Sequence, residues 1–84
     1  MNSKTRLYVA RLSYDAQNRD LMELFSQHGT VKEAKVIMDR ETGKSRGFAF
    51  VEMNSAVEAE RALALDGEKI LGRNIAVSFA REKE

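Results

Sequence analysis

The chain has 84 residues, 43% of them apolar, which is enough for one small domain with a real core. It contains no cysteine and one histidine, His28, which excludes a disulfide framework, a thiol nucleophile and any metal site that needs two imidazoles. With 14 basic and 13 acidic residues the net charge is +1, so bulk electrostatics does not favour a nucleic-acid ligand. Residues 1–50 nevertheless hold nine bases against six acids.

The sequence shows no sign of a second domain or of a membrane-spanning segment. No apolar run approaches the roughly 18 residues that span a bilayer, and the N-terminus leads into a short strand instead of a signal peptide. Cytosol is therefore the expected compartment, with no membrane contact. Residues 1–84 are predicted to form a single domain with a core over about 6–80 and a short charged tail at 81–84.

The spacing of apolar residues predicts the element order β-α-β-β-α-β. The expected elements are strands over 6–12, 30–38, 46–53 and 74–80, helices over 18–27 and 55–65, a turn at 13–15, a hairpin loop at 39–45 and a short extended piece at 69–71. Two helices can cover only one face of a four-stranded antiparallel sheet. The expected fold is therefore an α+β, ferredoxin-like sandwich with one sheet face open to solvent.

The same spacing predicts which side chains are buried. The expected core residues of the strands and the second helix are Leu7, Val9, Val36, Ala49, Val51, Met53, Ala56, Ala59, Ala62, Leu63, Ile75, Val77 and Phe79. The expected outward residues of the last strand are Ala76, Ser78 and Ala80. Tyr14 and Phe25 are assigned to packing, and His28, beside a glycine, is interpreted as a helix-end residue and not as a catalytic base.

Two phenylalanines share one face of the strand over 46–53, because alternate side chains of a strand point to opposite faces. A domain has no folding reason to expose Phe48 and Phe50 together, so either something covers them or they form a contact surface. In the expected topology the first and third strands are central neighbours. Tyr8 would then join the two rings in one aromatic platform on the open face.

Residues 46–53, Arg-Gly-Phe-Ala-Phe-Val-Glu-Met, match the ribonucleoprotein signature of RNA-recognition motifs at every fixed position except the last, where Met53 replaces an aromatic. Residues 7–12, Leu-Tyr-Val-Ala-Arg-Leu, resemble the shorter hexamer of that family, although Ala10-Arg11 stand where Gly-Asn is frequent. Both motifs and the element order extend the resemblance over residues 6–80. The chain resembles in particular the small single-domain RNA-binding proteins of bacteria.

The resemblance implies a monomer that binds short single-stranded RNA on its open face without chemistry, over roughly two to four nucleotides. By this resemblance Tyr8 and Phe48 would each stack on a base, and Phe50 would pack against the sugars. Arg46 would pair with a phosphate. The other expected RNA-binding residues are Arg6, Lys35, Ile37, Lys44, Ser78 and Arg81. Each stacked base is worth about 1–3 kcal/mol, which indicates micromolar affinity.

Other ligands and functions stay open at this level. Single-stranded DNA is a second expected ligand, because the sequence offers no clear reader of the 2′-hydroxyl. A protein-interaction module is the main alternative, although members of the family that bind proteins usually lose the aromatics. The same scaffold also hosts acylphosphatases. An enzyme is not expected, since the sequence has no phosphate-cradling loop, metal cluster or paired nucleophile and base, and no cofactor or small-molecule substrate is expected either.

Overall fold

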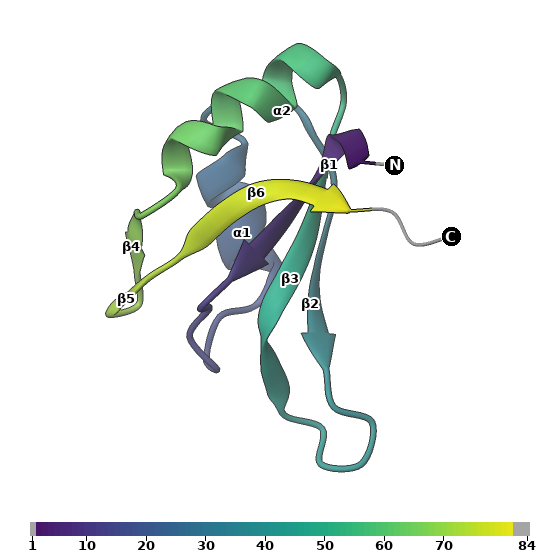
Figure 1. The fold of residues 1–84 in the computed structure, drawn as a ribbon. Coiled ribbons are helices and arrows are strands. Elements are labelled where there is room, and N and C mark those ends of the chain that lie inside the picture. The colour runs from purple at the N-terminus through teal and green to yellow at the C-terminus, as the bar shows by residue number, and fades with distance from the viewer. Residues whose placement is uncertain (1, 82–84) are drawn as a thin grey trace.

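The computed structural model describes residues 2–81, without the side chains of residues 2, 3 and 81 (Figure 1). Residues 82–84 of the expected charged tail lie outside the described residues. The elements are β1 (Asn2–Ala10), α1 (Asn18–Phe25), β2 (Val31–Met38), β3 (Ser45–Met53), α2 (Ala56–Ala62), a 3₁₀ turn η1 (Leu63–Leu65), β4 (Lys69–Ile70), β5 (Arg73–Asn74) and β6 (Ala76–Arg81). None of the helices in residues 2–81 has the length and apolarity needed to span a bilayer.

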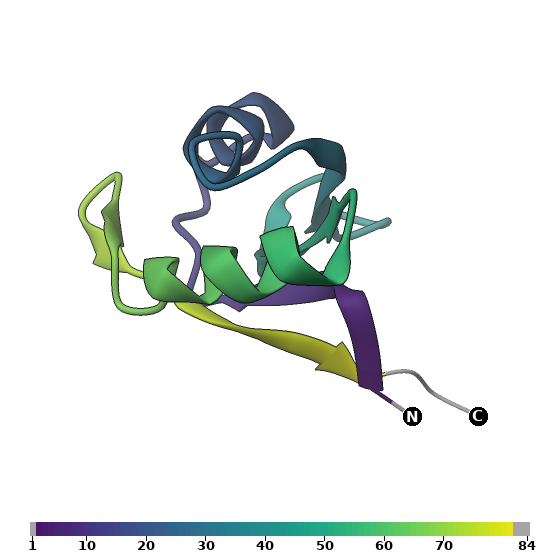
Figure 2. The same cartoon turned by 90° about the horizontal axis from the view of Figure 1, so that it is seen from above.

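The main sheet is antiparallel with strand order β2-β3-β1-β6, so β1 and β3 are the central neighbours that the sequence predicts. Their register pairs Tyr8 with Phe50 and Val9 with Ala49. Seen from above, α1 and α2 lie on the same side of this sheet (Figure 2). The predicted α+β sandwich, with helices on one sheet face, is confirmed.

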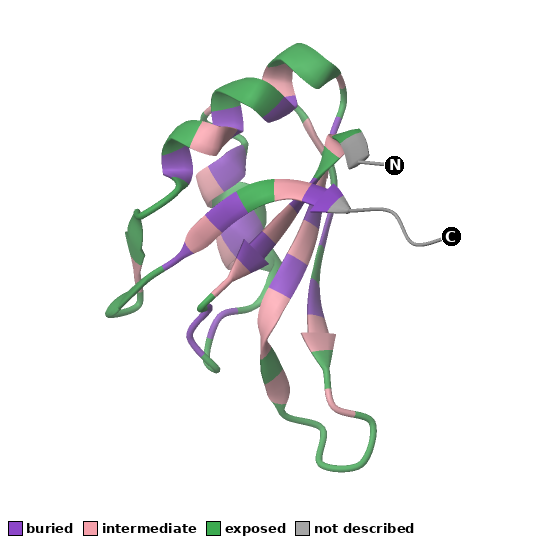
Figure 3. Ribbon diagram, viewed as in Figure 1, coloured by how far each residue is buried: buried purple, intermediate pink, exposed green. Residues whose placement is uncertain are grey.

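The core fills the space between the helices and the sheet (Figure 3). Its largest fully buried side chains are Phe25, Leu7, Leu12, Leu21, Met53, Ile75, Val9 and Val51. Burial alternates along β3: Ala49, Val51 and Met53 have no exposed surface, whereas Phe48 and Phe50 are partly exposed. The two faces predicted for this strand are therefore confirmed.

Helix α2 begins where the sequence predicts, at a cap on Ser55. The Ser55 Oγ accepts a hydrogen bond from the backbone N–H of Glu58 at 3.3 Å and donates one to Glu58 Oε1 at 2.9 Å. The other carboxylate oxygen of Glu58 accepts from the Thr30 N–H at 2.9 Å, which ties α2 to the start of β2. The Thr30 N–H, and after it the Ser55 hydroxyl, hold the pKa of Glu58 below its usual value of 4.5.

The prediction that Tyr14 is a packing residue is wrong. Its side chain is 67% exposed. Leu12, Ser13 and Ala16 are the buried residues of the loop between β1 and α1, and Tyr14 among them points outward. Loop residues have no fixed period, so alternation could not place this ring.

Two alanines are also placed differently from the prediction. Ala56 is exposed because it opens α2, while Ala59 and Ala62 carry the buried side of the helix. Ala80 was expected outside but is buried, at 3% exposure. In the β1–β6 pairing the register shifts between Asn2 and Leu7, so residues 3–6 of β1 stand opposite Ala80 alone and simple alternation does not hold at this position.

Two strand boundaries differ from the prediction because of backbone conformation. β1 ends at Ala10 because Arg11 has φ +58°, outside the strand region. Leu71 and Gly72 have φ +49° and +85°, so they form a tight turn that folds β5 back onto β4. The last main strand therefore starts at Ala76 and not at residue 74.

Candidate nucleic-acid interface

Three aromatic rings lie together on the open face of the sheet, and we call them the aromatic platform: Tyr8 from β1, and Phe48 and Phe50 from β3. The Tyr8 ring centroid lies 5.7 Å from that of Phe48 and 5.6 Å from that of Phe50. The two phenylalanine rings are 6.1 Å apart and nearly perpendicular, at 88°. This edge-to-face contact and the two tilted contacts of Tyr8 hold the rings together, and all three residues stay partly exposed. The common face predicted for the three rings is confirmed.

Two arginines lie against the platform. The Arg6 guanidinium carbon is 4.7 Å from the Phe50 ring centroid, and that of Arg46 is 5.9 Å from the Phe48 centroid. Both distances are within the range of a cation–π contact. Each phenylalanine thus has one guanidinium beside it, which positions positive charge next to the ring surface.

The other predicted site residues are spread around the platform. Lys35 is exposed and stands opposite Phe50 in the β2–β3 register, and Ile37 is partly exposed on the same face. Ser78 is exposed on the other flank, opposite Tyr8. Lys44 lies apart from the rings, in the hairpin loop between β2 and β3. The backbone of Arg81 ends β6, but its side chain lies outside the described residues.

Two acidic side chains lie at one end of the open face. They were not among the site residues predicted from the sequence. Glu52 follows Phe50 on the same face and accepts a hydrogen bond from the Thr5 hydroxyl at 2.6 Å. Glu33 stands opposite Glu52 in the β2–β3 register. The alternation that puts Phe48 and Phe50 on one face also puts Glu52 there, so the position of Glu52 could have been predicted from the sequence.

The hairpin loop at the other end is ordered by one carboxylate. Asp39 Oδ1 accepts hydrogen bonds from the backbone N–H groups of Glu41 at 2.8 Å and Thr42 at 3.1 Å. These two bonds, Thr42 first, hold the pKa of Asp39 below its usual value, and the charge of Arg46 adds to the effect. The loop closes with an N–H···O bond of 2.7 Å from Asp39 to Lys44. Lys44 is therefore presented by a loop with a defined shape, and Arg46 follows it near the start of β3.

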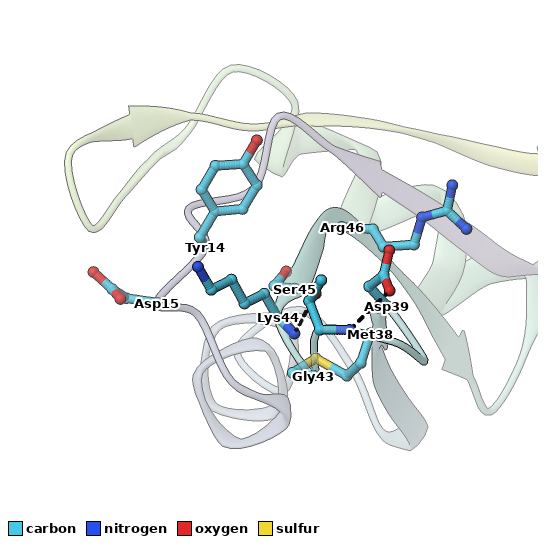
Figure 4. Close-up of a pocket in the computed structure, with 9 residues that line it drawn as sticks. Tyr14, Asp15, Met38, Asp39, Gly43, Lys44, Ser45 and Arg46 are labelled. Carbon is cyan, nitrogen blue, oxygen red and sulfur yellow. Dashed lines mark hydrogen bonds between the residues drawn. The ribbon is translucent and has the colours of Figure 1, made fainter.

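Beside this loop the surface has a hollow of about 700 Å³ (Figure 4). Exposed Tyr14 and Asp15 line one side of it, and Met38 and the hairpin loop line the other. The sequence reasoning missed Tyr14 as a surface residue. The only available signal was its place in a predicted turn, which does not say on which side a ring lies.

Nothing in the described residues resembles a metal centre. Within residues 2–81 no three His, Cys, Asp or Glu side chains are grouped so that they could hold an ion. His28 follows α1, and its backbone N–H donates to the Phe25 carbonyl at 3.0 Å. The interpretation of His28 as a helix-end residue is confirmed.

Comparison with known proteins agrees with this geometry. The family described as RNA recognition motif matches residues 7–76, which include all three residues of the aromatic platform. The chain belongs to the RNA recognition motif (RRM) family. The family resemblance carried by the hexamer and the octamer is therefore confirmed. Proteins of this family are in general non-catalytic.

Relatives of the RRM include both long and short proteins. The chain is 47% identical over 81 residues to glycine-rich RNA-binding protein 5, mitochondrial, of Arabidopsis thaliana, covering 96% of this chain and 28% of that protein. It is 48% identical to the 28 kDa ribonucleoprotein, chloroplastic, of Spinacia oleracea, covering 93% and 34%. It is 43% identical to the putative RNA-binding protein RbpA of a Synechocystis strain, covering 93% and 78%. The chain thus spans about a third or less of the two plant proteins.

Solved structures of similar fold confirm the architecture. The structure of RNA binding protein PG1 superposes with a TM-score of 0.88 at 43% identity, over 95% of this chain and 98% of that one. A Sxl-lethal protein/RNA complex gives a TM-score of 0.91 at 34% identity, over 98% and 50%.

The relatives correct one prediction from the sequence. Cytosol was the expected compartment, yet the two plant relatives above are named as mitochondrial and chloroplastic proteins. These names point to organelles and contradict the cytosolic prediction. The pattern of apolar residues on which the cytosolic prediction rested carries no information about organelles, so the inference from it was not valid.

Proposed function

We propose that this RRM binds single-stranded RNA by stacking bases on the aromatic platform. The observation that carries the proposal is the cluster of Tyr8, Phe48 and Phe50 on the sheet face opposite the buried side chains of β3. A cluster of partly exposed aromatic rings lowers the solubility of a protein unless a ligand or partner covers it. An unpaired base offers two π-faces to such rings, and each stack is worth about 1–3 kcal/mol.

The roles of the three rings follow from their positions. Tyr8 and Phe48 belong to neighbouring strands, so each can carry one base, and Phe50 beside them packs against the sugars. Two or three such contacts bind roughly two to four nucleotides with micromolar affinity. In a duplex the faces of the bases are covered by neighbouring bases and are not accessible to the rings. The proposed ligand is therefore single-stranded. Single-stranded DNA offers the same π-faces and is proposed to bind as well.

The charges around the platform orient the strand. Arg46 lies at the Phe48 end. At the other end Glu33 and Glu52 lie beyond Phe50, where Arg6 stands opposite Glu52, so carboxylates outnumber the one arginine among these three residues. Phosphates are therefore expected near Arg46 and Lys44 and away from the carboxylates. The flanks of the platform complete the proposed contact set with Arg6, Lys35, Ile37, Ser78 and Arg81.

RNA as the ligand is supported by the names of related proteins. One structural neighbour is a protein/RNA complex, and the relatives above are named as RNA-binding proteins or ribonucleoproteins. We propose that the domain acts as a monomer and without catalysis. Because the chain spans only part of the plant relatives, the activities of those whole proteins are not transferred to it.

The test is a titration of a labelled random-sequence RNA pool of about eight nucleotides, read by fluorescence anisotropy. Wild type is expected to bind in the micromolar range, and Phe48→Ala/Phe50→Ala is expected to lose most of that affinity. Val57→Ala is the matched control, because it removes an exposed apolar side chain from α2, on the covered side of the sheet. Equal affinity of wild type and the double variant would overturn the proposal, and so would a wild type that binds no RNA.

A further inference from the structure

We propose that two side chains, Asn18 and Asp66, cap the two edges of the main sheet and prevent the domain from pairing edge to edge with a second copy of itself. The strand order β2-β3-β1-β6 leaves β2 and β6 each with a neighbour on one side only. The outer backbone N–H and C=O groups of such edge strands can pair with a strand of another molecule. We call the two side chains the edge caps, and they act whether or not the platform binds RNA.

The first edge cap, Asn18, lies at the edge of β2. Its Oδ1 accepts a hydrogen bond from the backbone N–H of Val36 at 2.8 Å. Val36 stands opposite Ala49 in the β2–β3 register, and its N–H is donated to α1 instead of β3, so this N–H points out of the sheet. Along an antiparallel strand the outward N–H groups recur at every second residue. The bond therefore occupies one of the groups that an incoming strand would need.

The helix that begins with Asn18 holds this cap in place. Leu21 and Phe25 of α1 are fully buried, so the helix is anchored in the core. The start of α1 is fixed further by a hydrogen bond of 2.8 Å from the Gln17 N–H to Asp20 Oδ2. The Asn18 oxygen is therefore presented to β2 by a segment that packing keeps beside the sheet.

The rest of the β2 edge is also poorly suited to pairing. The register between β2 and β3 shifts near both ends of β2, and irregularities of this kind bend an edge strand. Lys32, Glu33 and Lys35 of the same strand are exposed. Charged side chains along an edge disfavour the approach of another strand. The Val36 N–H lies between the two irregular ends, which is where a regular ladder could otherwise form.

The second edge cap, Asp66, does the same for β6. Its Oδ1 accepts a hydrogen bond from the backbone N–H of Val77 at 2.9 Å. Val77 stands opposite Val9 in the β1–β6 register, and because its N–H is donated to Asp66, this group points away from β1. Asp66 directly follows η1, whose Leu65 is buried at 4% exposure. A buried residue thus anchors this cap from one side.

Backbone hydrogen bonds anchor the second cap from the other side. The Gly67 N–H donates to the Ile75 carbonyl at 2.8 Å, and the Ile75 N–H donates to the Glu68 carbonyl at 2.9 Å. The Asn74 Nδ2 donates to the Gly67 carbonyl at 2.9 Å. The chain that follows Asp66 is therefore folded back against the start of β6, which keeps the carboxylate opposite the Val77 N–H.

Loss of a cap would favour association for a physical reason. Val36 and Val77 are both buried, at 6% exposure each. The N–H of a buried residue that loses its acceptor costs free energy until it finds another one. A strand of a second copy offers backbone carbonyls at the spacing that an edge strand requires. Removal of the acceptor oxygens is therefore expected to convert a monomer into an edge-paired dimer.

The test compares variants that remove the acceptor oxygens with variants that keep them. Asn18→Ala/Asp66→Ala removes both oxygens, whereas Asn18→Asp/Asp66→Asn retains one at each position. Analytical ultracentrifugation at rising protein concentration is expected to show monomers for wild type and for the oxygen-retaining variant, and a shift to dimers for the alanine variant. A folded alanine variant that stays monomeric would overturn the proposal. So would equal association of the two variants, or a wild type that is itself dimeric.

A second measurement uses wild type and decides the matter even if the alanine variant does not fold. Amide hydrogen exchange, read by NMR, is expected to be slow at Val36 and Val77 although both lie on edge strands, because each N–H has an acceptor. In Asn18→Ala exchange should accelerate at Val36 and not at Val77, and in Asp66→Ala the reverse is expected. Exchange in wild type at these two valines as fast as in the turn at residues 71–72 would refute the caps.

Discussion

The two faces of β3 carry side chains of the same apolar kind in different surroundings. Ala49, Val51 and Met53 point to the helix layer and have no exposed surface, whereas Phe48 and Phe50 point away from it and stay partly exposed. The alternation of the strand determines to which face each side chain points. The position of the helices determines which of the two faces is buried. Neighbouring side chains of β3 therefore have different roles. Those on the inner face stabilise the folded state, and those on the outer face are proposed to contact RNA.

The largest effect is expected on the inner face. Met53→Ala should lower the free energy of unfolding by about 2–5 kcal/mol, because Met53 is fully buried and its truncation leaves a cavity. RNA affinity of the folded fraction should not change. Urea denaturation measures the first quantity, and anisotropy below the unfolding midpoint measures the second. A stable Met53→Ala variant with weakened RNA binding would reverse the assignment of the two faces.

The matched change on the outer face is Phe48→Ala. It is expected to weaken RNA binding by about 1–3 kcal/mol and to cost less stability than Met53→Ala, since Phe48 is partly exposed on the open face beside Tyr8, Phe50 and Arg46. The same two assays apply. If Phe48→Ala unfolds the domain, the ring belongs to the core and the platform has been misassigned.

A smaller effect concerns the salt dependence of the outer face. About two phosphate contacts, at Arg46 and Lys44, predict a slope near −1.4 in a plot of log affinity against log salt concentration. A fourfold rise in salt would then weaken binding about sevenfold. Titrations at several salt concentrations measure this slope. A slope of about −6 or steeper would mean that phosphates, and not the rings, dominate the affinity.

The smallest effect concerns the layer that covers the inner face. The pKa of Glu58 lies below 4.5 in the folded state, chiefly because the Thr30 N–H stabilises the charged form. Stability from a lowered pKa is complete above the unfolded-state pKa and is lost as pH falls through the folded-state pKa. The free energy of unfolding should therefore decrease below about pH 4.5, and less so in Glu58→Gln. Urea titrations at several pH values measure this, and an identical decrease in both proteins would contradict it.

Periodic segments allowed most of the fold and the platform to be predicted. Phe48 and Phe50 are two apart in a strand, so their common face follows from geometry, and the two-helix order placed Tyr8 beside them. Ala80 shows where this reasoning stops, because a register shift in the β1–β6 pairing buries a residue that alternation turns outward. The β4–β5 hairpin depends on Leu71 in a left-handed conformation, which its residue type does not signal.

The surroundings of the platform were harder to predict than the platform itself. Tyr14 lies in a loop whose inward positions are taken by Leu12 and Ala16, a choice that only tertiary packing reveals. The hollow beside the ring forms from segments far apart in the sequence, residues 14–15 and 38–46. The periodicity of apolar residues does not predict contacts between such distant segments.

The most direct test of the account is an NMR titration of the isotope-labelled domain with a random-sequence RNA pool. If RNA binds on the aromatic platform, the ring signals of Tyr8, Phe48 and Phe50 shift on binding and give cross-peaks to RNA base protons, while signals of α1 and α2 stay in place. Cross-peaks from the helices, with the three ring signals unchanged, would contradict it.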